Sequence, residues 1–146
     1  MAGTHALGGY VTAQRLEWTH TAAVAIVDES VIATIAVPNK AIILDVILEV
    51  TAVGDTGATL VYDVGDASGP STADDDRFIL GFSGQAVGNI RASDSAGLLE
   101  GPYAYRNLAG TDDAQIEQEI ELTIDTVAAT GAIATGVLTI IYIADQ

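Results

Sequence analysis

The chain has 146 residues, with 20 aspartates and glutamates against five lysines and arginines, which gives a formal net charge of −15. Direct binding to nucleic acid is not expected, because contacts with phosphate groups require cationic side chains. The absence of cysteine excludes disulfides and thiolate metal sites. Hydrophobic residues make up 49% of the chain, but no apolar run approaches the roughly 18 residues that span a bilayer as a helix. A membrane contact is therefore not expected. No secretory signal is expected either, because the start, MAGTHALGGY, has no basic region followed by an apolar core.

Residues 1–21 are predicted to form an extended N-terminal arm that precedes one β-sandwich domain over residues 22–146. The alternation over residues 10–17 gives no clean apolar face, and an extended segment that cannot bury itself tends to pair with a neighbour. Trp18 fits either a plug at the end of the core or an anchor in an interface, where tryptophan is enriched. The candidate interface residues of the arm are therefore Tyr10, Arg15 and Trp18.

The stretch over residues 41–53 predicts a long strand around which the sandwich is organised. Its side chains alternate with period two, and β-branched and aliphatic residues predominate. The alternation places Ile42, Leu44, Val46, Leu48 and Val50 on one apolar face. This face requires a second sheet to cover it.

Turn signals separate the long strand from shorter strands on both sides. Residues 23–37 predict a hairpin before it, and Pro38 favours a turn at its start. Residues 54–57 predict a second hairpin, which joins the long strand to a strand over residues 58–64. A further strand is expected over residues 77–83. The expected core-facing residues of these two strands are Leu60, Tyr62, Val64, Phe78, Leu80 and Phe82.

Residues 63–76 are expected to form a solvated acidic loop. Gly65, Gly69 and Pro70 oppose regular structure, and five aspartates concentrate negative charge there. Carboxylate oxygens suit Ca²⁺, but no glutamate closes an EF-hand ligand set. Arg77 is a ready ion-pair partner for this loop. Residues 84–101 are less regular and suit partner contacts, and a short strand is expected over residues 101–105.

Two strands are predicted near the C-terminus. Residues 115–125 alternate isoleucines and leucine with glutamates, so that one face meets the core and the other meets water. The glutamates are expected to prevent edge-to-edge pairing of this strand. Residues 136–144 are apolar on both faces, so this strand should lie centrally in a sheet or be covered by another subunit. Ile141 and Ile143 are therefore candidate subunit-interface residues.

Eight or nine short strands with regular turn signals indicate an all-β fold, an antiparallel β-sandwich of jelly-roll type. The only histidines are His5 and His20, and no metal-binding or serine-hydrolase motif occurs. Asp45 and Glu49 are interpreted as part of a polar stripe on a strand rather than as a glycosidase pair. No enzyme activity, catalytic residue, metal or cofactor is therefore expected.

Three segments, VPNKAIILDVILEVT, ATLVYDVGDA and ADDDRFI, resemble small β-sandwich virion proteins of tailed bacteriophages. The resemblance covers roughly a third of the chain, and its motifs are structural. The matching positions are Val37, Pro38, Leu44, Asp45, Val46, Leu60, Asp63, Val64, Gly65, Asp66, Asp76, Arg77, Phe78 and Ile79.

The resemblance implies a capsid decoration, or cement, protein that sits on the outside of the virion after synthesis in the bacterial cytoplasm. Its expected partners are the major capsid protein, whose neighbouring subunits it would bridge, and further copies of itself in a homotrimer. A head fibre or tail protein would use the same fold. Two functions outside the virion also fit a β-sandwich: a carbohydrate-binding module that uses Tyr103 and Tyr105, and a Ca²⁺-dependent adhesin that uses residues 63–76.

Overall fold

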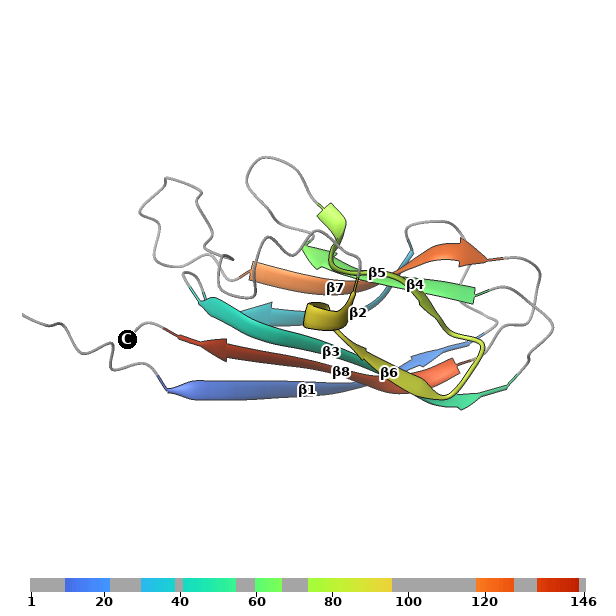
Figure 1. Ribbon diagram of the computed structural model, residues 1–146, viewed down its shortest axis with the longest axis horizontal. Coiled ribbons are helices and arrows are strands. Elements are labelled where there is room, and N and C mark those ends of the chain that lie inside the picture. Colours follow the sequence, from blue (N-terminus) through green and yellow to red (C-terminus); the bar gives the residue numbers. More distant parts are fainter. Residues whose placement is uncertain are drawn as a thin grey trace, which may run out of the picture.

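Two four-stranded antiparallel sheets pack face to face in the computed structural model of the chain (Figure 1). The structure describes residues 10–21, 30–38, 41–54, 60–66, 74–95, 118–127 and 134–144. Sheet A has the strand order β1 (Val11–His20), β8 (Ala134–Ile143), β3 (Ile42–Val53) and β6 (Gly88–Arg91). Sheet B has the order β2 (Val31–Val37), β7 (Gln118–Val127), β4 (Leu60–Asp66) and β5 (Asp74–Ser83). A 3-10 turn, η1 (Ala92–Asp94), follows β6.

This arrangement confirms the predicted antiparallel β-sandwich. Strand β1 pairs with β8, β2 with β7, β3 with β6, and β4 with β5. Such nested pairs arise when one long antiparallel hairpin is rolled into two sheets, as in double-sheet folds of the jelly-roll kind. The pairing thus supports the jelly-roll topology, which itself stays a prediction.

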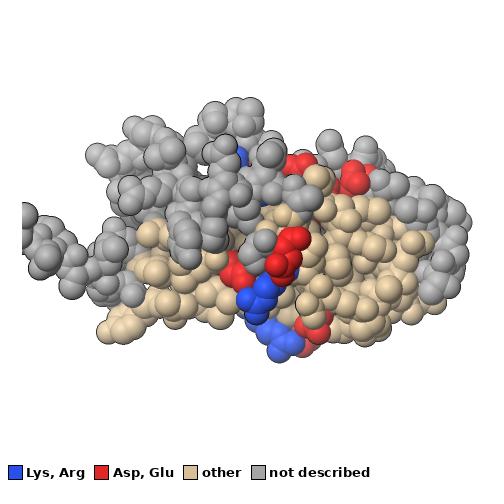
Figure 2. Space-filling view, in the orientation of Figure 1, with Lys and Arg blue, Asp and Glu red and all other residues tan. Residues whose placement is uncertain are grey.

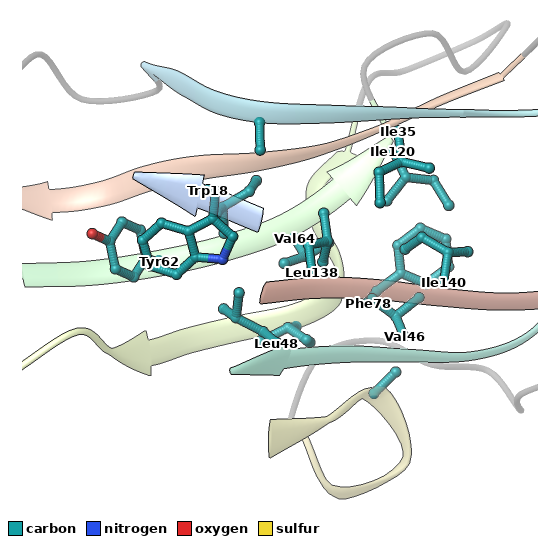
Figure 3. Close-up of a cluster of buried hydrophobic side chains, with 14 of the residues drawn as sticks. Trp18, Ile35, Val46, Leu48, Tyr62, Val64, Phe78, Ile120, Leu138 and Ile140 are labelled. Carbon is teal, nitrogen blue, oxygen red and sulfur yellow. The ribbon is translucent and has the colours of Figure 1, made fainter. Parts of the chain in front are cut away.

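The core lies between the inner faces of the two sheets (Figure 3). Alternate residues of each strand point inward, because successive side chains of a strand lie on opposite faces. Burying an isoleucine or leucine side chain in this way contributes about 1.5–3 kcal/mol. The fully buried residues include Val46 and Leu48 of β3, Tyr62 and Val64 of β4, Ile120 of β7, and Leu138 and Ile140 of β8.

The long strand is confirmed as β3, but its inward face differs from the prediction. The pairing of β3 with β8 shifts by one residue between Ile43 and Asp45, and such a bulge exchanges the two faces of a strand. Ile43 and Val46 are therefore buried, whereas Ile42 lies on the outer side. The assignment of Ile42 and Leu44 to the core face was wrong.

The hairpin predicted at residues 54–57 was also wrong. Strand β3 belongs to sheet A and β4 to sheet B, so the chain crosses between the sheets here. The core face predicted for β4 is nevertheless confirmed, because Leu60, Tyr62 and Val64 are buried.

Part of the predicted acidic loop is strand. Strand β4 continues to Asp66 and β5 begins at Asp74, and Gly65 lies within β4. Leu80 was wrongly placed in the core: it is 43% exposed. The cause is an irregular pairing of β4 with β5, at which Gly81 adopts a φ of 72° that favours glycine.

The C-terminal strands differ in how well they were predicted. Strand β8 lies between β1 and β3, which confirms its central position. Strand β7 is also central, between β2 and β4, so the idea that its glutamates protect a sheet edge was wrong. Residues 84–101 were expected to be irregular, but part of this segment forms β6 and the turn η1. Strand β6 is short and pairs with only four residues of β3, so its sequence shows little alternation.

Residues 11–20 of the predicted arm form β1, an edge strand of sheet A. The division of the chain at residue 21 stays a prediction, as do the calcium-binding and carbohydrate-binding functions. Residues 1–9, the first part of the predicted 23–37 hairpin and residues 101–105 lie outside the described residues.

Candidate interaction surface

The outer face of sheet A carries rows of side chains that cross its central strands. Val11 of β1, Ile143 of β8 and Ile42 of β3 lie side by side in the first row. The next row contains Ala13 and Ile141, beside Asp45. Val11 is 64% exposed, and Ile141, Ile143 and Ile42 are half-buried. This end of the face is therefore mainly aliphatic, although no described strand covers it.

Charged residues follow these aliphatic rows. Arg15 of β1, Thr139 of β8, Ile47 of β3 and Arg91 of β6 form the third row. Glu17 and Glu49 lie in the row after it, on either side of Val137. In Figure 2, most of the visible basic side chains gather in one place, directly beside acidic ones. A row with two arginines is thus followed by a row with two glutamates. The face therefore carries both signs of charge, although the net charge of the chain is −15.

The two arginines of this face differ in their surroundings. Arg91 Nη1 lies 3.0 Å from Asp45 Oδ2, and Asp45 Oδ1 accepts the backbone N–H of Val46 at 2.9 Å. Asp45 therefore has a structural role that fixes Arg91 across the strands. Arg15 is exposed and has no ion-pair partner among the residues that the structure describes. Its guanidinium is available to a carboxylate from outside the chain.

The five predicted interface residues are not all on this surface. Arg15, Ile141 and Ile143 lie on the outer face of sheet A, and Tyr10, immediately before β1, is 76% exposed. Trp18 points the other way and is 4% exposed, which agrees with its interpretation as a core plug. A partner role for Tyr10, Arg15, Ile141 and Ile143 stays a prediction.

Trp18 belongs to an aromatic cluster that links the two sheets (Figure 3). Its ring meets Tyr62 of β4 edge to face, with centroids 5.1 Å apart. His20 Nδ1 lies 3.0 Å from the Tyr62 hydroxyl oxygen, and both side chains are fully buried. Burial lowers the pKa of His20 and raises the pKa of Tyr62. The cluster therefore contains a buried histidine that links β1 to sheet B through Tyr62.

The cluster depends on Gly136 of β8. A Cβ atom there would collide with the Trp18 ring and with the backbone oxygen of Glu49. This cluster was not predicted from the sequence, although His20 and Trp18 share a face by period two. The missing information was their contact with Tyr62, which lies 42 residues beyond His20.

The acidic residues of β4 are structural in the described part of the chain. Asp66 is 2% exposed, and its Oδ2 lies 2.7 Å from Arg77 Nε, so the predicted pairing of Arg77 with this stretch is confirmed. Asp63 is 3% exposed and accepts the backbone N–H of Gly81 across to β5. These carboxylates therefore stabilise the β4–β5 pair.

The described residues hold no group of three or more histidine, aspartate and glutamate side chains that could bind a metal ion. They also hold no helix that is long and apolar enough to cross a membrane.

No family model matches the chain, and no curated protein matches it either. A chain in the solved structure of the capsid of Ralstonia phage GP4 has a similar fold, with a TM-score of 0.56. The match covers 100% of this chain and 92% of that chain, at 21% sequence identity. The two chains therefore share a β-sandwich fold over almost their whole lengths.

Proposed function

We propose that this chain is a non-enzymatic structural protein of a phage virion, bound to the outside of the capsid. In this role it bridges neighbouring major capsid subunits and stabilises the assembled shell. The observation that carries the proposal is the likeness in fold, over the full chain, to a chain of a phage capsid. The resemblance of residues 37–51, 58–67 and 73–79 to phage virion proteins supports the same conclusion.

The outer face of sheet A is the proposed docking surface. Its aliphatic rows around Ile141 and Ile143 can bury apolar area against a capsid subunit. Arg15 has no ion pair within the described residues, so it can bind a carboxylate of the partner. The net charge of −15 suits the outside of the shell better than the DNA-filled interior.

The stabilisation requires only binding. A protein that binds the assembled shell but not free capsid subunits stabilises the shell by RT ln(1 + [L]/Kd) per site. At a free concentration of 100 times Kd this is about 2.7 kcal/mol for each site. Many equivalent sites on one shell add these increments.

The proposal is tested with particles of the phage that encodes this chain, assembled without it. Purified chain is added back, and the temperature at which the particles release DNA is measured by dye fluorescence. We expect the release temperature to rise and to saturate as the chain is added. The double variant I141S/I143S should fail to raise it.

The matched control is T34S/A36S, which places serine at two exposed positions of β2 on sheet B. This control should act like the unmodified chain. A release temperature that does not respond to the chain, or that responds equally to I141S/I143S, would contradict the proposal.

A further inference from the structure

Strand β1 is a long, regular edge strand of sheet A. Its ten residues, Val11–His20, pair with β8 without any register shift. In the described part of the chain no strand pairs with its other edge. The strand contains no proline and no glycine. Exposed edges of this kind are templates for another strand, and proline, bulges, short length and charged side chains are common ways to block them. Of these four, β1 has only the charged side chains Arg15 and Glu17, which oppose pairing unless the partner strand complements them.

The charges of β1 are arranged symmetrically about Leu16. Arg15 and Glu17 are both exposed on the outer side, and neither has an ion-pair partner among the described residues. Leu16 lies between them on the inner side, half-buried against the edge of the core. If a second β1 lay antiparallel beside the first, Arg15 of each copy could therefore lie opposite Glu17 of the other.

We propose that two copies of this chain associate through their β1 strands, antiparallel and centred on Leu16. In antiparallel pairing, directly opposite residues must share a face, so their residue numbers must add to an even sum. If the numbers of opposite residues add to 30, Arg15 of one copy lies opposite Arg15 of the other. If they add to 34, Glu17 lies opposite Glu17. Both registers place like charges together, which is unfavourable. A sum of 32 places Arg15 of each copy opposite Glu17 of the other. Charge therefore selects the register centred on Leu16.

The selected register also places compatible side chains opposite each other on the inner side. Leu16 faces Leu16 of the second copy at the two-fold axis, so the two half-buried side chains cover each other. Gln14 faces Trp18, and on the outer side Ala13 faces Thr19. The two copies of sheet A would form one continuous sheet, and their outer faces would form one larger surface.

This contact is isologous and closes a dimer. It differs from the threefold association that the family resemblance implies. It rests on β1 alone and does not require the proposed capsid role, so either proposal can fail without the other.

The proposal is tested by sedimentation velocity of the purified chain over a range of concentrations. We expect a species of twice the chain mass of 15.0 kDa, with a dissociation constant that rises about tenfold in either R15E or E17R. The double variant R15E/E17R should restore association, because the exchanged charges are again complementary. R91E changes the charge equally at the opposite edge of sheet A and should leave association unchanged.

A crosslink locates the two-fold axis independently. The chain has no cysteine, and Cβ atoms of directly opposite residues lie close enough for a disulfide after small adjustment. L16C should therefore form a disulfide-linked dimer on mild oxidation. A13C should not, because Ala13 faces Thr19 rather than its own copy.

Three results would overturn the proposal. The first is a monomer or a trimer at all concentrations. The second is a dimer that neither R15E nor E17R weakens. The third is a double variant R15E/E17R that associates no better than the single variants. Equal melting temperatures of the variants will show that both exposed substitutions leave the fold intact.

Discussion

The inner and outer faces of sheet A both carry aliphatic side chains, but only the inner face packs against sheet B. Ile140 and Ile141 are consecutive residues of β8; Ile140 is fully buried in the core, and Ile141 is half-buried on the outer side. The inner face also holds the Trp18 cluster, whereas the outer face holds Arg15 and the pair of Arg91 with Asp45. Folding therefore depends on the inner face, and the outer face is left open to the proposed partner.

The largest expected effect is the difference in stability loss between alanine substitutions at Ile140 and at Ile141. We expect Ile140→Ala to lower the free energy of unfolding by about 4 kcal/mol, since it leaves a cavity between the sheets. Ile141→Ala should cost about 1 kcal/mol or less. Urea denaturation of both variants measures the difference. Equal losses would mean that the two faces of β8 are not distinguished as the structure shows.

The next effect concerns close packing on the inner face. Gly136→Ala should cost about 3 kcal/mol, because the added methyl group meets the Trp18 ring and the Glu49 backbone. Gly88→Ala is the matched control on β6, where the nearest atom to the added carbon is 4.0 Å away. Its effect should stay within about 0.5 kcal/mol. Thermal unfolding followed by tryptophan fluorescence compares the two, and a harmless Gly136→Ala would contradict the packing around Trp18.

Only the inner face of sheet A contains a fully buried histidine among the described residues. Because burial lowers the pKa of His20 in the fold, the unfolded chain binds a proton at this residue at a higher pH than the folded protein does. Stability should therefore fall as the pH drops below about 6.5, the pKa of histidine in the unfolded chain, until the folded pKa is passed. His20→Gln should remove this part of the slope. An unchanged slope, or an NMR titration of His20 at or above pH 6.5, would contradict its burial.

The outer face of sheet B extends the comparison, because Glu119 and Glu121 of β7 lie there beside Ala36 and Thr34 of β2. Burial, together with the neighbouring charge of Glu119, raises the pKa of Glu121. A raised pKa means that stability falls as the pH rises from about 4.5 through the folded pKa. Glu121→Gln should therefore stabilise the protein at pH 7 by about 0.5 kcal/mol. Its gain should vanish at pH 4, and a loss of stability at pH 7 would show that the charge of Glu121 is favourable.

The strands themselves could be predicted from the sequence because alternation is a local property. The period-two patterns of β3, β4 and β8 appear within ten or so residues, and two sheets were required to cover them. The sequence did not reveal which side chains of a strand face the core, or which strands pair with each other. One inserted residue near Leu44 exchanged the faces at the start of β3, and Gly81 did the same to Leu80 in β5. Local alternation does not reveal a bulge, because the extra residue depends on the partner strand.

The candidate surface could be predicted only in part. The two-sided apolar pattern of β8 indicated Ile141 and Ile143, and the structure places them beside Arg15 on one face. The alignment of Arg15 with Arg91 could not be predicted, since it depends on three strand pairings between distant segments. The His20–Tyr62 contact was missed for the same reason.

The most direct test of the central claim is the position of the chain on intact particles. Antibodies against the purified chain, coupled to gold, are applied to unbroken particles of the encoding phage and observed by electron microscopy. We predict gold on the outside of the heads. Gold on the tails alone, gold only after the heads are broken, or no labelling at all would contradict the proposed place of this protein in the virion.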